Sequence, residues 1–153
     1  MESKSKAVFP NLDKAKYITL FGDASYDSNT KAYGWCVWIK YGSPAQTIVK
    51  SGGGIGIANS SEAEFQALAE GMKCVIELGN ATINKNIVVQ SDCLYAIGRI
   101  DKMVPDFLQT TQADRIYTKH VKGHQGTRTP RSAVNTLCDL NAKREMRKYR
   151  SKG

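Results

Sequence analysis

The stretch Tyr17-Ile-Thr-Leu-Phe-Gly-Asp23-Ala-Ser25 is rich in aromatic and β-branched residues, and a carboxylate follows its apolar part. This composition favours a β-strand, which we predict over residues 17–23. A second run, Asn86-Ile-Val-Val-Gln-Ser-Asp92, repeats the pattern of a strand followed by Asp. The two acids therefore mark the ends of two predicted strands. The elements between and after them decide whether those ends meet.

The stretch between the two runs changes from strand patterns to a helix pattern. Turn residues separate predicted strands at 33–41 and 46–54, and connections this short imply an antiparallel meander. Apolar residues then recur at helical spacing over residues 61–78, with Glu64 near the start of that helix. The elements that we predict further along are short helices at 94–100 and 105–113, a strand at 115–121 and a last helix at 132–149.

The order of these elements brings the ends of several of them to one edge. If the first strand runs upward, two hairpins send the third strand upward too, so the next helix begins at the top. That helix descends, and the later strands rise parallel to the first. Ligand sites of open α/β sheets lie at this edge, where the connections change direction. We therefore predict an α/β fold with a five-stranded mixed sheet, three antiparallel strands and then parallel strands, flanked by helices. The residues that the topology places at this edge are Asp23, Glu64, Asp92, His124 and Asp139.

Four carboxylates at one edge repel one another, so they need a cation. Oxygen ligands suit Mg²⁺ or Mn²⁺ better than zinc. Two such ions about 3.5–4 Å apart activate a water and stabilise the leaving oxygen of a phosphodiester. The chain has 22 basic and 14 acidic residues, a formal net charge of +8. This charge favours a polyanionic partner, such as nucleic acid or an anionic membrane, and a merely soluble basic protein is the alternative.

Each candidate residue also has an ordinary structural interpretation. Ser61 and Glu64 match a capping box, with Ser61 as the N-cap, and Glu62 and Glu70 compete with Glu64 as the acidic ligand of this helix. The two acids that follow strands also suit turns, and the acid of the last helix suits a solvated face. His124 suits an ordinary loop position.

The residues around the four acids resemble type 1 ribonuclease H over about residues 17–148. The Asp-Gly/Ala-Ser of that family's first strand is similar to Asp23-Ala24-Ser25, and its Asn-Asn-x-x-Glu to Ser60-Ser61-Glu62-Ala63-Glu64. Its Asp-Ser is similar to Asp92-Cys93. Its Val-Lys-Gly-His and Asn-x-x-Cys-Asp correspond to Val121-Lys122-Gly123-His124 and Asn135-Thr136-Leu137-Cys138-Asp139.

The resemblance implies a ribonuclease H-like fold for the predicted sheet. It also implies endonucleolytic cleavage of the RNA strand of RNA/DNA hybrids with two Mg²⁺ ions, for which Mn²⁺ is the expected substitute. By this resemblance His124 assists proton transfer or product release. The metal ligands that it implies are Asp23, Glu64, Asp92 and Asp139.

The departures from the family concern the grip on nucleic acid. Leu94 stands where a Gln is common, and Ser60 and Ser61 stand where two Asn are common. Only 32 positions separate Asp92 from His124, which leaves room for short helices but not for the family's basic protrusion. The basic last helix and the Lys-rich residues 1–16 are therefore the candidates for binding the phosphate backbone, and solubility is the alternative explanation of their charge. The residues that we expect to contact the hybrid, around the site and on the last helix, are Ala24, Ser25, Asn59, Ser60, Ser61, Asn135, Lys143, Arg144, Arg147 and Lys148.

The rest of the chain predicts a simple organisation. We expect a flexible basic arm at 1–16, the catalytic domain at 17–149 and a basic tail at 150–153. No apolar run reaches membrane-spanning length, the first residues lack the core of a signal peptide, and four cysteines without close pairing suit reduced thiols. These features predict a cytoplasmic monomer with no membrane partner and no small-molecule cofactor. Nuclear, viral and organellar settings stay open.

Two other functions compete with this prediction. One is a metal-dependent DNA nuclease of the same fold, of junction or integrase type, which the Val-Lys-Gly-His element disfavours. The other is a nucleic-acid-binding module without catalysis. The four acids disfavour the module, because a pure binder gains nothing from mutually repelling carboxylates that face phosphate.

Overall fold

The computed structural model describes residues 16–121 and 130–152. The predicted arm at 1–16, apart from Lys16, and His124 therefore lie outside the described residues. The described strands are β1 (Tyr17–Asp27), β2 (Ala32–Tyr41), β3 (Gln46–Ile55), β4 (Asn86–Ser91) and β5 (Arg115–His120). The helices are α2 (Ser60–Glu77), α3 (Leu94–Lys102), α4 (Val104–Thr110) and α5 (Pro130–Arg150), with a 3-10 turn, η2, at Gly79–Thr82.

The five strands form one mixed sheet in the order β3-β2-β1-β4-β5. Strands β1, β2 and β3 are antiparallel neighbours, whereas β4 pairs parallel to β1, and β5 parallel to β4. The predicted five-stranded mixed sheet, antiparallel and then parallel, is confirmed. None of the helices in the described ranges is long and apolar enough to cross a membrane.

The first strand is longer than the sequence predicts. Its pairing with β4 ends at Phe21 opposite Gln90, but its pairing with β2 continues to Asp27 opposite Ala32. Asp23 therefore lies inside a strand and does not close it, which corrects the prediction. It stands two residues beyond the point where β1 and β4 part.

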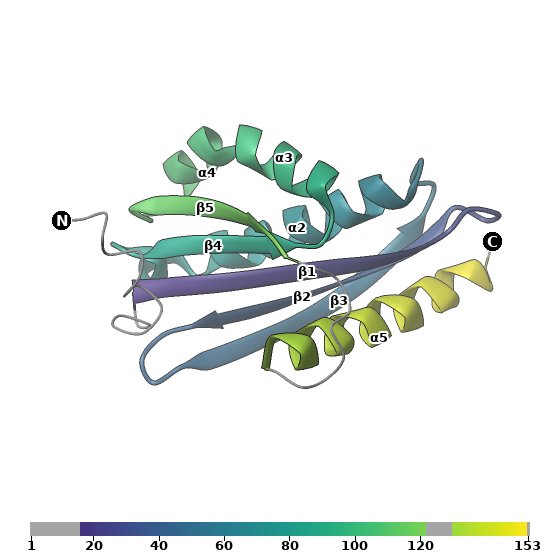
Figure 1. The fold of residues 1–153 in the computed structure, drawn as a ribbon, viewed down its shortest axis with the longest axis horizontal. Coiled ribbons are helices and arrows are strands. Elements are labelled where there is room, and N and C mark those ends of the chain that lie inside the picture. Colours follow the sequence, from purple (N-terminus) through teal and green to yellow (C-terminus); the bar gives the residue numbers. More distant parts are fainter. Residues whose placement is uncertain (1–15, 122–129, 153) are drawn as a thin grey trace.

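Helices cover both faces of the sheet (Figure 1). Leu20 of β1 belongs to a buried cluster with Leu68 of α2, whereas the next residue, Phe21, belongs to a separate buried cluster with Cys138 of α5. Successive strand residues point to opposite faces, so α2 and α5 lie on opposite sides of β1. The strand β1 therefore lies between the two helices and contacts side chains from both.

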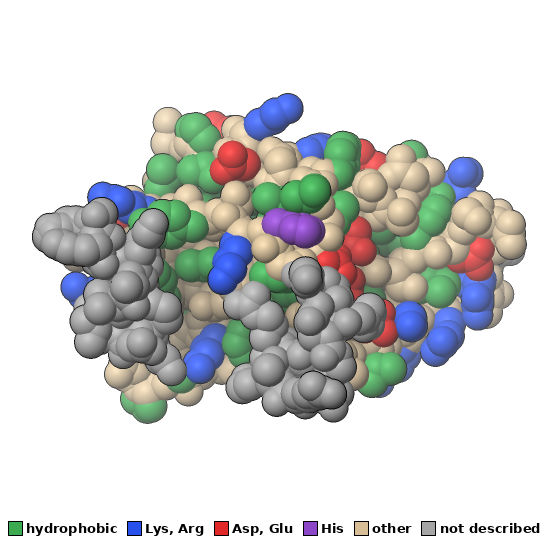
Figure 2. Space-filling view, in the orientation of Figure 1, with side chains coloured by type: hydrophobic (Ala, Val, Ile, Leu, Met, Phe, Trp, Pro, Cys, Tyr) green, Lys and Arg blue, Asp and Glu red, His purple; other side chains and the backbone are tan. Residues whose placement is uncertain are grey.

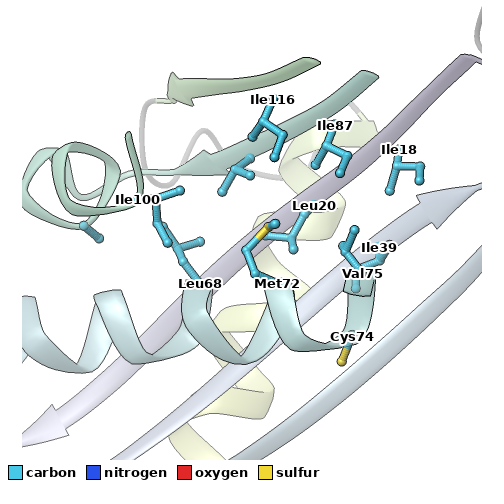
Figure 3. Close-up of a cluster of buried hydrophobic side chains, with 12 residues drawn as sticks. Ile18, Leu20, Ile39, Leu68, Met72, Cys74, Val75, Ile87, Ile100 and Ile116 are labelled. Carbon is cyan, nitrogen blue, oxygen red and sulfur yellow. The ribbon is translucent and has the colours of Figure 1, made fainter. Parts of the chain in front are cut away.

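The larger cluster joins three parallel strands to α2 and α3. Figure 3 shows Ile18, Leu20, Ile87 and Ile116 from the strands facing side chains of α2. Burying each large aliphatic side chain contributes about 1.5–3 kcal/mol, so this cluster fixes α2 against β1 and β4. The start of α2 is thereby held at the end of the parallel strands.

Helix α5 lies directly on the backbone of β2. A Cβ atom on Gly34 would be 2.1 Å from the carbonyl oxygen of Ala142 and 2.4 Å from the amide nitrogen of Met146. Only glycine permits this approach, because no real Cβ atom comes so near a backbone atom. The close contact holds the middle of α5, and with it Asp139, against the sheet.

Candidate metal centre

Two acids stand where neighbouring strands separate. Asp23 lies opposite Cys36 of β2, just past the last pair between β1 and β4. Asp92 immediately follows β4, which ends at Ser91. The carboxyl ends of parallel strands that separate leave a crevice in which ligands of α/β sheets are held. The predicted meeting of these two acids is consistent with the observed register.

Glu64 reaches the same edge from α2, which begins one residue earlier than predicted. The N-cap is Asn59, whose side-chain oxygen accepts a hydrogen bond of 2.9 Å from the Glu62 amide. The predicted capping box with Ser61 as N-cap is therefore wrong. Asparagine two positions upstream satisfies the end of the helix equally well. Glu64 is thus the fifth helical residue, and its carboxylate is not used in capping.

Three carboxylates come together at this edge. One ligand oxygen each from Asp23, Glu64 and Asp92 lies within 4.8 Å of the others. The Ala24 amide donates a hydrogen bond of 2.9 Å to Asp23 Oδ1. Glu64 Oε1 is buried and has no hydrogen-bond partner in the described part of the chain. A buried oxygen without a donor is costly, so this atom favours a cation beside it.

Burial and mutual repulsion both disfavour ionisation of these acids. Burial, followed by the charge of Asp92, raises the pKa of Asp23 to about 7, although the Ala24 amide acts against this. Burial, followed by the charges of Asp23 and Asp92, raises the pKa of Glu64 to about 9. The group therefore cannot carry its full negative charge at neutral pH unless a cation compensates it.

Asp139 lies outside this three-residue group but acts on it. Its charge raises the pKa of both Asp23 and Glu64. Its Oδ2 is 3.1 Å from the ammonium of Lys143, one helical turn further along α5. Because α5 begins at Pro130, two residues before the predicted start at residue 132, Asp139 stands in the third turn of the helix. The fourth acid therefore comes from the helix that covers the face of the sheet opposite to α2.

The competing acids of α2 have other partners. Arg99 of α3 donates to both carboxylate oxygens of Glu62, at 3.0 and 3.1 Å. The Tyr95 hydroxyl also donates to Glu62, and this hydrogen bond is the main cause of the lowered pKa of that carboxyl. Glu70 accepts from Gln66 at 3.0 Å. Of Glu62, Glu64 and Glu70, only Glu64 belongs to the three-carboxylate group.

One residue that supports the site was not predicted from the sequence. His120, the last residue of β5, lies opposite Ser91 of β4, and its Nε2 is 3.1 Å from the Asp92 carbonyl oxygen. A carbonyl only accepts, so this nitrogen carries the proton. His120 thus holds the peptide group that carries the third acid. The position of His120 was predictable in principle, because parallel pairing places the end of β5 beside the end of β4.

The residues expected to contact nucleic acid occupy different positions. Asn59 and Ser60 are exposed at the start of α2, and Ser61, Ala24 and Ser25 are half-buried nearby in the chain. Asn135 is buried. On α5, Lys143 pairs with Asp139, whereas Arg144, Arg147 and Lys148 are exposed. Figure 2 shows acidic side chains gathered on this face, with lysines and arginines spread around them.

Comparison with solved structures identifies the fold. The N-terminal RNase H domain of a Mycobacterium tuberculosis protein superposes on this chain with a TM-score of 0.63 at 17% sequence identity. The match covers 89% of this chain and 97% of that one. LC11-RNase H1, solved in complex with an RNA/DNA hybrid, gives 0.65 at 14% identity, over 86% and 97%. RNase H1 from the archaeon Halobacterium salinarum NRC-1 gives 0.58 at 17% identity, over 86% and 98%. No family model and no curated protein sequence matches the chain. The fold is ribonuclease H-like.

Proposed function

We propose that the protein is an endonuclease of the ribonuclease H type, which hydrolyses the RNA strand of RNA/DNA hybrids with two divalent metal ions. The observation that carries the proposal is the meeting of three carboxylates within 4.8 Å at the point where β1 and β4 part. This meeting occurs on a ribonuclease H-like fold, and the fourth acid of the family resemblance, Asp139, acts on the same group.

The donor set fits Mg²⁺ or Mn²⁺. The three-residue group offers carboxylate oxygens and no nitrogen or sulfur, which is the preference of hard cations. Glu64 Oε1 is buried without a partner among residues 16–121 and 130–152, and a cation would satisfy it. Asp23, Glu64, Asp92 and Asp139 would hold the ions. Ions bound there would activate the attacking water and stabilise the leaving oxygen of the phosphodiester.

The chain's own residues prepare this edge for a reaction. The Ala24 amide fixes one oxygen of Asp23, and His120 fixes the backbone of Asp92. We assign proton transfer or product release to His124, as the family resemblance implies. With Asp23 and the backbone of Asp92 held in place, these two carboxylates need little rearrangement when substrate binds.

The substrate assignment rests on charge and on the rim of the site. The net charge of +8 and the exposed Arg144 and Arg147 suit a phosphate backbone. Small polar groups at Ser25, Asn59 and Ser60 suit the 2′-hydroxyls of an RNA strand in a wide minor groove. One solved structure of this fold is bound to an RNA/DNA hybrid, which supports the same partner. We propose that the remaining contacts come from Ala24, Ser61, Asn135 and Lys143.

A cleavage assay tests the proposal. Labelled RNA/DNA hybrid, duplex RNA, duplex DNA and single strands are incubated with the wild type in Mg²⁺, Mn²⁺ or EDTA, beside Asp23→Asn. We expect cutting of the hybrid RNA strand alone, dependent on metal and lost in Asp23→Asn by at least about a thousandfold. The matched control is Asp114→Asn, because Asp114 is exposed and directly precedes β5, at the opposite end of the parallel strands. Its activity should equal that of the wild type.

Other results would point to the competing functions. Metal-dependent cutting of DNA without cutting of the hybrid would indicate a DNA nuclease. Tight binding of the hybrid by the wild type without cutting in either metal would indicate a binding module. Cutting that Asp23→Asn retains would place the reaction elsewhere in the molecule.

A further inference from the structure

Lys143 is one of the basic residues of α5 that we expect to contact phosphate. Its ammonium lies 3.1 Å from Asp139 Oδ2, one turn earlier on the same helix. The Lys143 side chain is 45% exposed, whereas that of Asp139 is only 17% exposed. The cation is therefore accessible to water while the acid that it contacts faces inward.

The charge of Lys143 also acts on an acid other than Asp139. It lowers the pKa of Asp23 on β1, against the effects of burial and of the two neighbouring acids. Two other cations of α5 pair with acids outside the site: Lys148 is 3.1 Å from Glu145, and Arg150 is 3.6 Å from Asp27. Lys143 thus compensates two acids of the candidate metal centre, Asp139 and Asp23.

We propose that Lys143 is a resident counter-cation of the acidic cluster, which holds Asp139 in the metal-free protein and competes with divalent ions for it. This inference rests on the proposed function, because it concerns the same metal centre. A lysine suits the role, since its ammonium is a compact charge on a flexible stem. A half-exposed ion pair is also weak enough for a metal ion to displace.

The competition has a consequence for metal affinity. A divalent ion that binds Asp139 must displace the ammonium and is repelled by it afterwards. Removing this charge while keeping a polar side chain should therefore strengthen metal binding. A unit charge a few ångströms from a divalent ion in a high dielectric changes its affinity about tenfold. An ordinary surface ion pair would have no such effect.

Calorimetric titration of the full chain with Mn²⁺, without nucleic acid, tests the inference. We expect Lys143→Gln to bind Mn²⁺ about tenfold more tightly than the wild type, and Lys143→Arg to bind as the wild type does. The matched control is Lys148→Gln, which removes an ion pair of the same length from the same helix and should leave the affinity unchanged. Thermal unfolding in EDTA gives a second measurement: Lys143→Gln should melt below the wild type and gain more from added Mn²⁺.

The outcomes separate this inference from the proposed function. Equal or weaker Mn²⁺ binding by Lys143→Gln, with normal binding by the wild type, overturns the inference alone. Equal tightening in Lys143→Gln and Lys148→Gln also overturns it, because general surface charge would then explain the effect. A wild type that binds no Mn²⁺ contradicts both the inference and the metal centre on which the proposed function depends.

Discussion

Neutralising Glu64 should stabilise the metal-free protein. The side chain is held beside two other acids, and its Oε1 is buried with no hydrogen-bond partner among the residues that the structure describes. The pKa of its carboxyl is raised from 4.5 to about 9, first by burial and then by the charges of Asp23 and Asp92. Glu64→Gln keeps the shape of the side chain and removes the charge, so it removes this cost of folding.

The size of the effect follows from the pKa. Because the folded-state pKa is raised, the stability is fully present below the unfolded-state pKa of 4.5 and is lost as the pH rises toward about 9. The loss grows by about 1.4 kcal/mol for each pH unit in this window, which amounts to about 4 kcal/mol at pH 7.5. For a domain of this size, about 4 kcal/mol corresponds to about 8–16 °C in melting temperature.

Thermal unfolding followed by circular dichroism, in EDTA at pH 5 and pH 7.5, measures the effect. We expect Glu64→Gln to melt about 8–16 °C above the wild type at pH 7.5, with a smaller difference at pH 5. The control is Glu77→Gln, because Glu77 is an exposed acid on the same helix, and it should change stability by less than about 0.5 kcal/mol. A Glu64→Gln variant that is no more stable than the wild type at pH 7.5, or whose advantage does not grow with pH, would refute the reasoning.

Two further substitutions test the packing and the support of the site. Gly34→Ala places a Cβ 2.1 Å from the Ala142 carbonyl oxygen, so urea unfolding should show a loss of about 3 kcal/mol or more; a loss below about 0.5 kcal/mol would contradict the close approach of α5. His120→Ala removes the hydrogen bond to the Asp92 carbonyl and should weaken Mn²⁺ binding about tenfold. His120→Gln retains an N–H donor and should restore most of that affinity, whereas equal binding by both variants would show that the hydrogen bond does not support the site.

The fold was predictable where local patterns and short connections agree. The observed bounds of β4, Asn86–Ser91, are those predicted, because an apolar run between polar residues permits little else. The antiparallel and then parallel arrangement follows from two tight hairpins and two helical crossovers. By contrast, the polar end of β1 becomes a strand only because Tyr26 and its neighbours pair with β2. That pairing depends on another part of the chain, and residue propensity does not reveal it.

The site was predictable as a set of acids but not in its details. Asp23, Glu64 and Asp92 meet as the topology required. The cap was misplaced because Asn59 and Ser61 both suit the start of a helix, and local sequence does not choose between them. The contact between Lys143 and Asp139 could have been predicted, since an acid and a base four residues apart on a helix are neighbours. The role of His120 needed the register between β4 and β5.

Anomalous diffraction from crystals soaked in Mn²⁺ is the most direct test of the metal centre at this edge of the sheet. We predict a Mn²⁺ peak at coordinating distance, about 2.0–2.2 Å, from carboxylate oxygens of Asp23, Glu64 and Asp92, with Asp139 close enough to share the second ion. The same crystals of Asp23→Asn should lose or greatly weaken this peak. Well-ordered wild-type crystals with no Mn²⁺ between these carboxylates, or with Mn²⁺ bound only elsewhere, would contradict the assignment.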